Sequence, residues 1–525
     1  MSTNCDFAYH SYFSLVTETD SRDGFELAFN PFDNQNYSST YNTKEVNTPD
    51  IKYDASAGSI TVNRAGDYSV VAGIMMAHTG SFQEGPVVRF KKNGSNVAVF
   101  GPQNIWGARD PRQSIGQSIV SFDDGDTFSI EVENTDSSSE TGVMAASGSY
   151  LFMVKANGPY GFLGYSADAD VAFSGSGTNI DIFEGQKGGT VVSKLKDTSF
   201  AQTATTGRLE PSLTRKYLCI STLYYTTNGA TDGIQHKIAI DGSAVDEMTI
   251  GNIAPSADPV HNTFAFLKEV ANDEAIGPRR GSDDTKQFTP TIGTSFSIVD
   301  ISNNGIDPDA YLSFSVVNDS SDLGANVNKS IFKAANYGSF ETNDHVTATN
   351  ITFNSADGSF TVSLGGDYLV LLNMDFFPVD ADKMINIKVL KNDVDYHIDR
   401  VFLDNQSDPQ SHTAFLIMTL AADDVLNFKV DHLDGKIDDG SSITIIKLDN
   451  VREIEDINLE AEPNNQIAGD FTLNTFGAGT LTHQHKRITD QVPFTLGIPG
   501  PLSLRGKCFG TSKTPANVST GDKKN

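Results

Sequence analysis

The chain has 525 residues, more than a single hydrophobic core usually serves, so several domains are expected. Its 67 acidic side chains outnumber 38 basic ones, and the formal charge of −29 opposes attraction to phosphate backbones. Nucleic acid is therefore not an expected partner. With 45 Gly, 33 Phe and 16 Tyr, the composition favours short strands and tight turns, and only scattered short helices are expected, for example around Leu267–Ile276.

The three cysteines, Cys5, Cys219 and Cys508, are odd in number and far apart in the chain. This spacing does not fit a disulfide framework or a paired-thiol metal site. The first residues lack the basic start and apolar core of a secretory signal, and no later stretch reaches ~18 consecutive apolar residues. We therefore expect free thiols, synthesis in a cytoplasm and no membrane contact.

A segment at residues 58–68, GSITVNRAGDY, recurs twice along the chain. The later copies are GRLEPSLTRKY at 207–217 and GSFTVSLGGDY at 358–368, and their opening glycines are spaced 149 and 151 residues apart. Apolar and polar residues alternate on both sides of a glycine-containing turn, a pattern that predicts a strand, a sharp turn and a second strand. Gly58, Gly66, Gly358 and Gly366 take the turn positions, where positive φ is permitted.

Further landmarks follow each copy in the same order. About 35 residues after the opening glycine comes a hairpin-turn pair: Asn93–Gly94, Asp241–Gly242 and Asn392–Asp393. The segment FDDGDTFSIEV at 122–132 matches LAADDVLNFKV at 420–430, while the middle copy offers IGTSFSIVDI at 292–301. Each copy is expected to close on an apolar strand, at 150–154, 311–316 and 443–448. On this alignment the middle copy has roughly twenty extra residues, expected as a surface excursion within 250–290.

This ordered pattern resembles the jelly roll of the complement globular-head and tumour-necrosis-factor (TNF) family. The resemblance is good over residues 1–156 and 321–450 and weaker over 157–320, where Lys216 and Pro290 depart from the other copies. It implies an all-β fold of three tandem antiparallel jelly-roll β-sandwiches (TNF-like). It also implies a homotrimer whose inner sheets meet at a threefold axis, and no catalytic chemistry. The expected organisation is jelly roll 1 at 1–156, jelly roll 2 at 157–320, jelly roll 3 at 321–450 and an extended C-terminal attachment segment at 451–525.

Two groups of residues are candidate metal ligands. Asp434, Asp438 and Asp439 lie in an acidic loop that offers oxygen ligands to calcium, although turn-forming aspartates explain the same loop and the EF-hand spacing is absent. His483 and His485 alternate along the chain, so an extended strand would place both imidazoles on one face. Three such strands would offer a transition metal six nitrogens, and the alternative is a surface arm with two histidines.

No phosphate loop, paired-cysteine zinc pattern or nucleophile elbow occurs in a convincing context, so an enzyme is not expected. Arg279-Arg280, close to two aspartates, is interpreted as a solvated loop.

The leading functional hypothesis is a virion structural protein of a tailed bacteriophage, made in the host cytoplasm. It would be a trimeric capsid-decoration or head-fibre protein that contacts capsid or other virion proteins. A receptor-binding tail appendage that recognises a host-surface glycan shares nearly every feature. The alternatives from other classes are a bacterial adhesin and a calcium-dependent carbohydrate-binding protein. This inference is an analogy from architecture.

Overall fold

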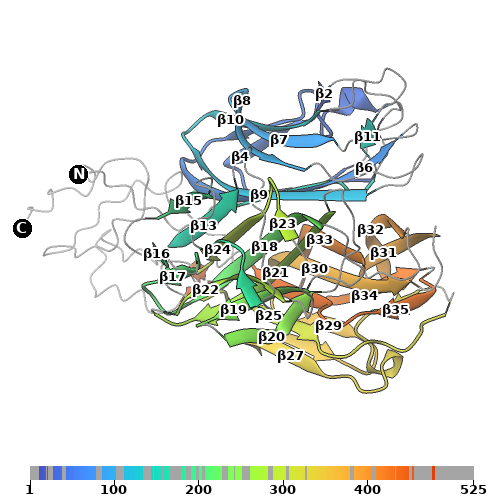
Figure 1. Ribbon diagram of the computed structural model, residues 1–525. Helices are drawn as coiled ribbons and strands as arrows, with labels where there is room; N and C mark the ends of the chain where they lie inside the picture. The colour runs from blue at the N-terminus through green and yellow to red at the C-terminus, as the bar shows by residue number, and fades with distance from the viewer. Residues whose placement is uncertain are drawn as a thin grey trace, which may run out of the picture. The chain divides into compact units, whose positions relative to one another are not determined.

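The computed structural model describes most of residues 11–448, and beyond them residues 452–454 and 476–478. Inside the first range the description omits 19–20, 22–27, 38–42, 79–85, 102–111, 134–142, 146, 157, 166–178, 185–190, 197–199, 204–206, 228–234, 242, 251–259, 273, 282–287, 303–306, 325–327, 379–382, 404–409 and 432. The regular secondary structure of the described residues is almost entirely β-strand, and these strands form three sandwiches of two antiparallel sheets each (Figure 1).

The first sandwich pairs an inner with an outer sheet, both six-stranded within the described residues. The inner sheet runs in the order β9 (Arg112–Phe122), β6 (Gly66–His78), β12 (Tyr150–Lys155), β1 (Tyr12–Thr17) and β3 (Thr43–Asn47), with β11 (Val143–Ala145) also beside β6. The outer sheet is β4 (Ile51–Asp54), β5 (Ser59–Val62), β10 (Asp126–Glu133), β7 (Val87–Lys92) and β8 (Ser95–Phe100), with β2 (Ala28–Phe29) beside β10. A short 3₁₀ turn, Asn34–Asn36, follows β2.

The second sandwich repeats this strand order. Its inner sheet is β21 (Val260–Val270), β18 (Arg215–Thr227), β24 (Ser295–Asp300), β13 (Tyr160–Tyr165) and β15 (Val191–Leu195), with β23 (Phe288–Pro290) beside β18. Its outer sheet is β16 (Phe200–Gln202), β17 (Leu209–Pro211), β22 (Ile276–Gly281), β19 (Gln235–Ile240) and β20 (Ser243–Ile250), with β14 (Asn179–Asp181) beside β22.

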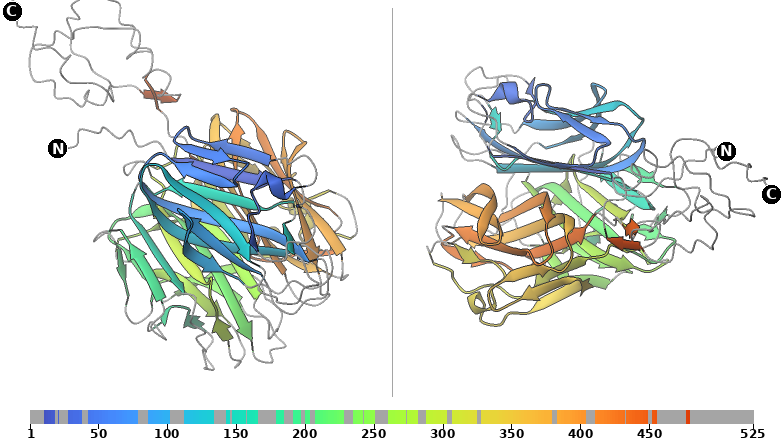
Figure 2. Two further views of the ribbon diagram at one scale, coloured as in Figure 1. Left: turned by 90° about the horizontal axis from the view of Figure 1, so that it is seen from above. Right: turned by 180° about the vertical axis from the view of Figure 1, so that it is seen from behind.

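The third sandwich follows the same order again, and Figure 2 shows its sheets from two further sides. Its inner sheet is β33 (Gln410–Leu420), β30 (Gly366–Pro378), β36 (Ser442–Lys447), β25 (Tyr311–Val316) and β27 (Thr342–Thr349), with β35 (Gly435–Ile437) beside β30. Its outer sheet is β28 (Ile351–Asn354), β29 (Ser359–Val362), β34 (Val425–Asp431), β31 (Lys383–Lys391) and β32 (Val394–Leu403), with β26 (Lys329–Ser330) beside β34. A 3₁₀ turn, Ala334–Asn336, follows β26.

The repeated sequence segment has one conformation wherever it occurs. Gly58, Gly207 and Gly358 all have positive φ, at 58°, 67° and 77°. Ten residues further on, Tyr68, Tyr217 and Tyr368 are completely buried, and each hydroxyl donates to the carbonyl four residues before it, at 2.9, 2.8 and 2.7 Å. The hairpin residues Asn93, Asp241 and Asn392 also have positive φ. The tight turns expected from the sequence are therefore confirmed at these positions.

The two kinds of sheet differ in how many faces are covered. In outer strands such as β10 and β34, buried apolar residues alternate with more accessible polar ones, because one face packs on the core and the other meets water. In the inner strands β1, β24, β25 and β36 every residue is buried. Their second face must be covered as well, and the cover comes from the neighbouring sandwich. One continuous apolar core accordingly joins residues of all three sandwiches, among them Val71, Leu218 and Leu369.

The boundary between the second and third sandwiches differs from the expected one at residue 320. Tyr311–Val316 was expected to close the second sandwich, but β25 pairs with β36 and β27 of the third. The second sandwich closes instead on β24, Ser295–Asp300, which pairs with β18 and β13. The prediction was wrong because both segments are short apolar strands, and local pattern alone does not say which sheet a strand joins.

The expected surface excursion within 250–290 is also wrong. Gly207 precedes Ile276 of β22 by 69 residues, where Gly58 precedes Phe128 by 70 and Gly358 precedes Leu426 by 68. The middle copy thus has no insertion before this strand. The sequence of β22, IGPRRG, lacks the alternating apolar pattern of β10 and β34, so β24 was mistaken for it. The short helix expected at Leu267–Ile276 is absent as well, since Leu267–Val270 belong to β21.

The chain divides into two units, His10–Leu448 and, separately, Met1–Tyr9 with Asp449–Asn525. In the second unit the described residues form a two-stranded ribbon of β37 (Arg452–Ile454) and β38 (Phe476–Ala478). No helix in the described part of the chain is long and apolar enough to cross a membrane.

Candidate functional site

The three sandwiches contact one another through equivalent strands. Strand β9 of the first lies against β18 and β24 of the second, and β21 of the second lies against β25, β27, β30 and β36 of the third. Strand β33 of the third then lies against β1, β3 and β12 of the first. We call these contacts the first, second and third joint, after the sandwich that contributes the edge strand. The joints run head to tail and close into a ring within one chain.

The second and third joints each contain a hydrogen bond at the same position. The amide of Leu267 in β21 donates to Ser313 Oγ at 3.2 Å, and the amide of Ile417 in β33 donates to Ser14 Oγ at 3.1 Å. Leu267 and Ile417 hold the same register position, opposite Leu218 and Leu369. Because these amides belong to edge strands and point at another sandwich, the bonds tie neighbouring sandwiches together.

The third joint also contains stacked aromatic rings. The ring of Phe415 stacks on Tyr150 and Phe152 of the first sandwich, with centroids 5.6 and 6.4 Å apart. Burial of such rings supplies apolar area together with favourable offset stacking.

The first joint uses different chemistry at the same positions. Ile119 packs into an apolar cluster with Tyr160, Phe162 and Val299 of the second sandwich. Gln117 takes the place that Phe415 has in the third joint; its Nε2 donates to the carbonyl of Ile220 at 2.9 Å, and its Oε1 accepts from Ser297 Oγ at 2.7 Å. The three joints are formed by equivalent strands but have different side chains. This difference allows each sandwich to pair with one specific neighbour.

Lys216, which departs from the acidic residue of the other copies, belongs to the second joint. Its ammonium lies 5.3 Å from the ring centroid of Tyr311 in the third sandwich and 2.5 Å from the carboxylate of Asp307. Burial opposes the charge, but the bond and charge of Asp307 outweigh it and raise the pKa of Lys216. In the third joint the equivalent residue, Asp367, accepts a hydrogen bond from Tyr12 instead.

All three edge strands meet at a buried polar junction. Gln113 of β9 exchanges two hydrogen bonds with the backbone of Thr413 in β33, at 2.8 and 3.2 Å. Thr413 Oγ1 in turn donates to the carbonyl of Thr263 in β21 at 2.7 Å. Tyr224 of the second sandwich accepts from the amide of Ile115 and donates to its carbonyl, at 3.0 and 2.8 Å.

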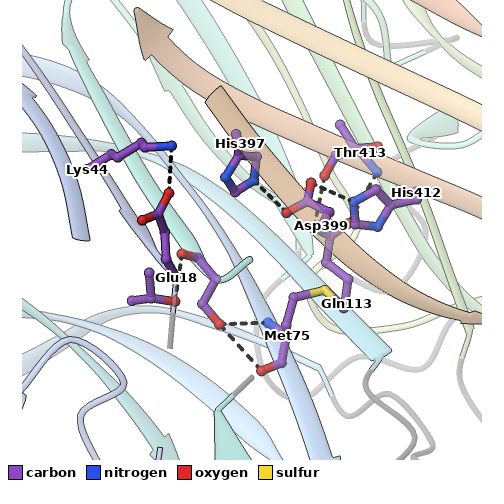
Figure 3. A network of polar contacts seen from close by, with 10 residues as sticks. Glu18, Lys44, Met75, Gln113, His397, Asp399, His412 and Thr413 are labelled. Atoms are coloured by element: carbon purple, nitrogen blue, oxygen red, sulfur yellow. Dashed lines mark hydrogen bonds and ion pairs between the residues drawn. The ribbon is translucent and has the colours of Figure 1, made fainter. Parts of the chain in front are cut away.

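A carboxylate held by two imidazoles lies beside this junction (Figure 3). His397 Nε2 is 2.6 Å from Asp399 Oδ1, and His412 Nε2 is 3.0 Å from Asp399 Oδ2. All three side chains are at most 3 % exposed. On the side of the first sandwich, a Cβ added to Gly148 would come within 2.6 Å of Asp399 Oδ1, so only a glycine fits there. Burial alone would raise the pKa of Asp399, but the facing imidazoles of His397 and His412 lower it well below its usual range.

Two further buried histidines lie at the joints. His261 of β21 stacks on Tyr224 at 5.2 Å, and its Nδ1 has no hydrogen-bond partner among the described residues. His345 of β27 bonds to Ser313 and Ser315 at 2.9 and 3.2 Å and meets the ring of Phe266 edge-on. Burial lowers the pKa of both to about 3, helped by the charge of His412 for His261 and of Lys268 for His345.

None of these junction residues was singled out from the sequence. His261 comes from β21, whereas His397 and His412 come from the consecutive strands β32 and β33, so the three share no sequence motif. Single histidines in apolar strands carry no signal that separates them from ordinary core residues.

The structure brings two of the three predicted calcium ligands together. Asp438 and Asp439 approach Asp319, and one carboxylate oxygen of each lies within 4.8 Å of the others. Asp434 is not part of this group. Burial, the hydrogen bond that protonated Asp438 donates to Asp319, and the charge of Asp375 raise the pKa of Asp438 to about 9, so the carboxyls share a proton where no cation replaces it. Three carboxylates are fewer ligands than calcium takes, and backbone carbonyls or water would complete the shell.

The remaining predictions concern the C-terminal histidine pair, the Arg279 segment and the cysteines. His483 and His485 lie outside the described residues. Arg279 is buried in β22 and pairs with Asp181 at 3.2 Å, together with Arg208, so the solvated loop expected at Arg279 was wrong. Cys219 is a buried free thiol, as expected.

Comparison with known proteins gives similarity at the level of fold. No family model matches the chain, and no curated protein matches its sequence. Among solved structures it is similar to murine APRIL, with a TM-score of 0.19, 15 % identity, and coverage of 26 % of this chain and 98 % of that one. Eiger TNF from S. frugiperda has a TM-score of 0.20, 14 % identity, and coverage of 26 % and 92 %. Rabbit GITRL has a TM-score of 0.17, 13 % identity, and coverage of 26 % and 93 %. The chain is all-β, with tandem antiparallel β-sandwiches.

Proposed function

We propose that this chain is a non-enzymatic structural protein that displays jelly rolls on a bacteriophage particle, as a capsid decoration or head fibre. The observation that carries the proposal is the closed ring of three joints within one chain. Such a ring fixes the sandwiches relative to one another and turns their outer sheets, with polar residues on the exposed face, toward the surroundings. A protein built for display needs this rigidity and needs no reactive centre.

The threefold arrangement is part of the same proposal. The sequence led us to expect a homotrimer of chains, joined through inner sheets at an axis. In the His10–Leu448 unit the three sandwiches of one chain already cover one another's inner sheets. We therefore assign the threefold packing to a single chain, and association of several chains would use surfaces outside the joints.

The second unit supplies the attachment in this proposal. Residues 451–525 lie outside the repeat, begin acidic and end basic, and belong to a unit separate from the ring. A segment outside the repeat is free to contact the particle while the sandwiches face the surroundings. Its partners would be capsid or other virion proteins.

The experiment is a deletion of residues 451–525. The truncated chain should keep its β-sheet circular dichroism and its solubility, but should no longer join particles that lack the protein. Absence of the full chain from purified particles would refute the proposal. Full occupancy by the truncated chain would refute only the assignment of the attachment segment.

The acidic group Asp319, Asp438 and Asp439 favours one alternative, a calcium-dependent carbohydrate-binding protein. Binding to a glycan array that disappears with a chelator and returns with calcium would support it. A receptor-binding tail appendage or an adhesin would instead retain glycan binding in the chelator.

A further inference from the structure

The described histidine side chains are concentrated where the sandwiches meet. Five are described, and all five are buried: His236, His261, His345, His397 and His412. Four of them lie at the joints or the junction, and His236 lies inside the second sandwich between Ser221 and Asn262. Imidazole is the side chain that ordinarily gains charge between pH 7 and 5. This placement therefore makes the contacts between the sandwiches sensitive to pH.

The groups that face each joint histidine decide how it responds to acid. His397 and His412 face the carboxylate of Asp399, so a proton on either imidazole has an anion beside it. Tyr150 of β12 faces the same carboxylate from the first sandwich. Asp399 thus links His397 of β32 to His412 of β33 at this part of the junction.

His261 and His345 have no such anion among the described residues. His261 faces the imidazole of His412 from β33 and the ring of Tyr224 from β18. His345 faces the hydroxyls of Ser313 and Ser315 from β25, and Phe266 and the ammonium of Lys268 from β21. A proton on His345 would place a second cation beside Lys268, and a proton on His261 would place a cation in a buried site without an anion among the described residues.

We propose that the second joint and the junction form an acid-sensitive latch, which holds the ring closed while His261 and His345 are neutral and opens when they are protonated. The latch acts between sandwiches, so each sandwich keeps its own sheets when the joint opens. Neutral solution gives a rigid ring, and a mildly acidic compartment or surface gives a ring opened at one joint.

The direction of the pH effect follows from the pKa values. Each imidazole has an ordinary pKa of 6.5 when exposed and about 3 in the closed ring. The open state therefore binds more protons, and stability of the joint is present above pH 6.5 and is lost as the pH falls from 6.5 toward 3. The population of the open state should rise about tenfold for each pH unit and each histidine in this window.

The amide of Leu267 is a direct reporter of the second joint, because it donates to Ser313 across the joint and not to its own sheet. Hydrogen exchange of the full-length protein, corrected for the intrinsic rate at each pH, should show loss of protection at Leu267 between pH 7.5 and 4.5. Amides inside the β18–β24 ladder should stay protected over the same range. Equal protection of Leu267 at both pH values would overturn the proposal.

Three variants separate the latch from general acid unfolding. The double variant His261→Gln, His345→Gln should keep Leu267 protected at pH 4.5. The matched control His236→Gln removes a buried histidine inside the second sandwich and should leave the acid response of Leu267 unchanged. If circular dichroism at pH 7.5 shows that the double variant is misfolded, each single variant tests the same point. Removing one histidine should make the rise in the open-state population about tenfold smaller for each pH unit. A variant that folds but opens like the wild type would refute the assignment.

Discussion

At the scale of single residues, the opening position of each repeat requires glycine for two reasons: its φ is positive, and neighbouring atoms leave no room for a Cβ. Gly358 has a φ of 77°, and a Cβ there would lie 2.3 Å from Ser330 Oγ and 2.8 Å from the backbone nitrogen of Lys333. We expect Gly358→Ala to lower the free energy of unfolding by roughly 2 kcal/mol or more, measured by urea denaturation. Gly338→Ala is the control, because nothing lies within 4 Å of its Cβ position. Equal losses in the two variants would contradict this explanation.

The buried tyrosine of each repeat gives a second residue-scale prediction. Tyr68, Tyr217 and Tyr368 each donate one hydrogen bond to a carbonyl four residues earlier. Replacing any one by Phe keeps the ring and removes the bond, so each variant should lose about 1 kcal/mol of unfolding free energy. Chemical denaturation of the three single variants tests this expectation. A loss confined to one sandwich would show that the repeats are not energetically equivalent at this position.

At the scale of strands, the sequence predicted the sandwiches where alternation is clear and failed where it is not. The repeat, its turns and the outer strands β10 and β34 follow from period-two burial. Strand β22 could not be found that way, because Pro278 interrupts it and its Arg279 is buried only through a pair with Asp181. The joints were equally out of reach, since their residues come from different sandwiches. Lys216 was the one joint residue that stood out in the sequence, because it departs from the acidic residue of the other copies. The structure explains this departure by its contact with Tyr311 of the third sandwich.

The loop between β35 and β36 makes a prediction about pH. Asp438 has a pKa of about 9 in the folded chain against 3.8 in the unfolded chain, so the folded state holds the extra proton. Stability is then lost as the pH rises from 3.8 toward 9. Asp438→Asn cannot ionise, so its melting temperature relative to wild type should increase from pH 4.5 to pH 8 in chelator. A difference independent of pH would contradict the raised pKa. Calcium that raises the melting temperature of the wild type but not of the variant would assign the group to a cation.

At the scale of the whole molecule, the ring decides how many chains a threefold assembly needs. In a head-to-tail arrangement each sandwich offers an edge strand and an inner sheet, and a ring of three leaves neither of them free. The three joints in the His10–Leu448 unit use β9, β21 and β33 together with the inner sheets they cover. Three separate chains would therefore have no unused inner sheet to share.

The full-length protein should accordingly behave as one chain in solution. Multi-angle light scattering at micromolar concentration and pH 7.5 should give the mass of a single polypeptide. The variant Phe415→Ala tests the reason, because it removes the ring that stacks on Tyr150 and Phe152 at the third joint. It should cost about 3 kcal/mol of stability and loosen the joint without changing the mass. A threefold mass that falls to one chain in Phe415→Ala would mean that the joints form between chains, by exchange of sandwiches, and that the closed ring of one chain is wrong.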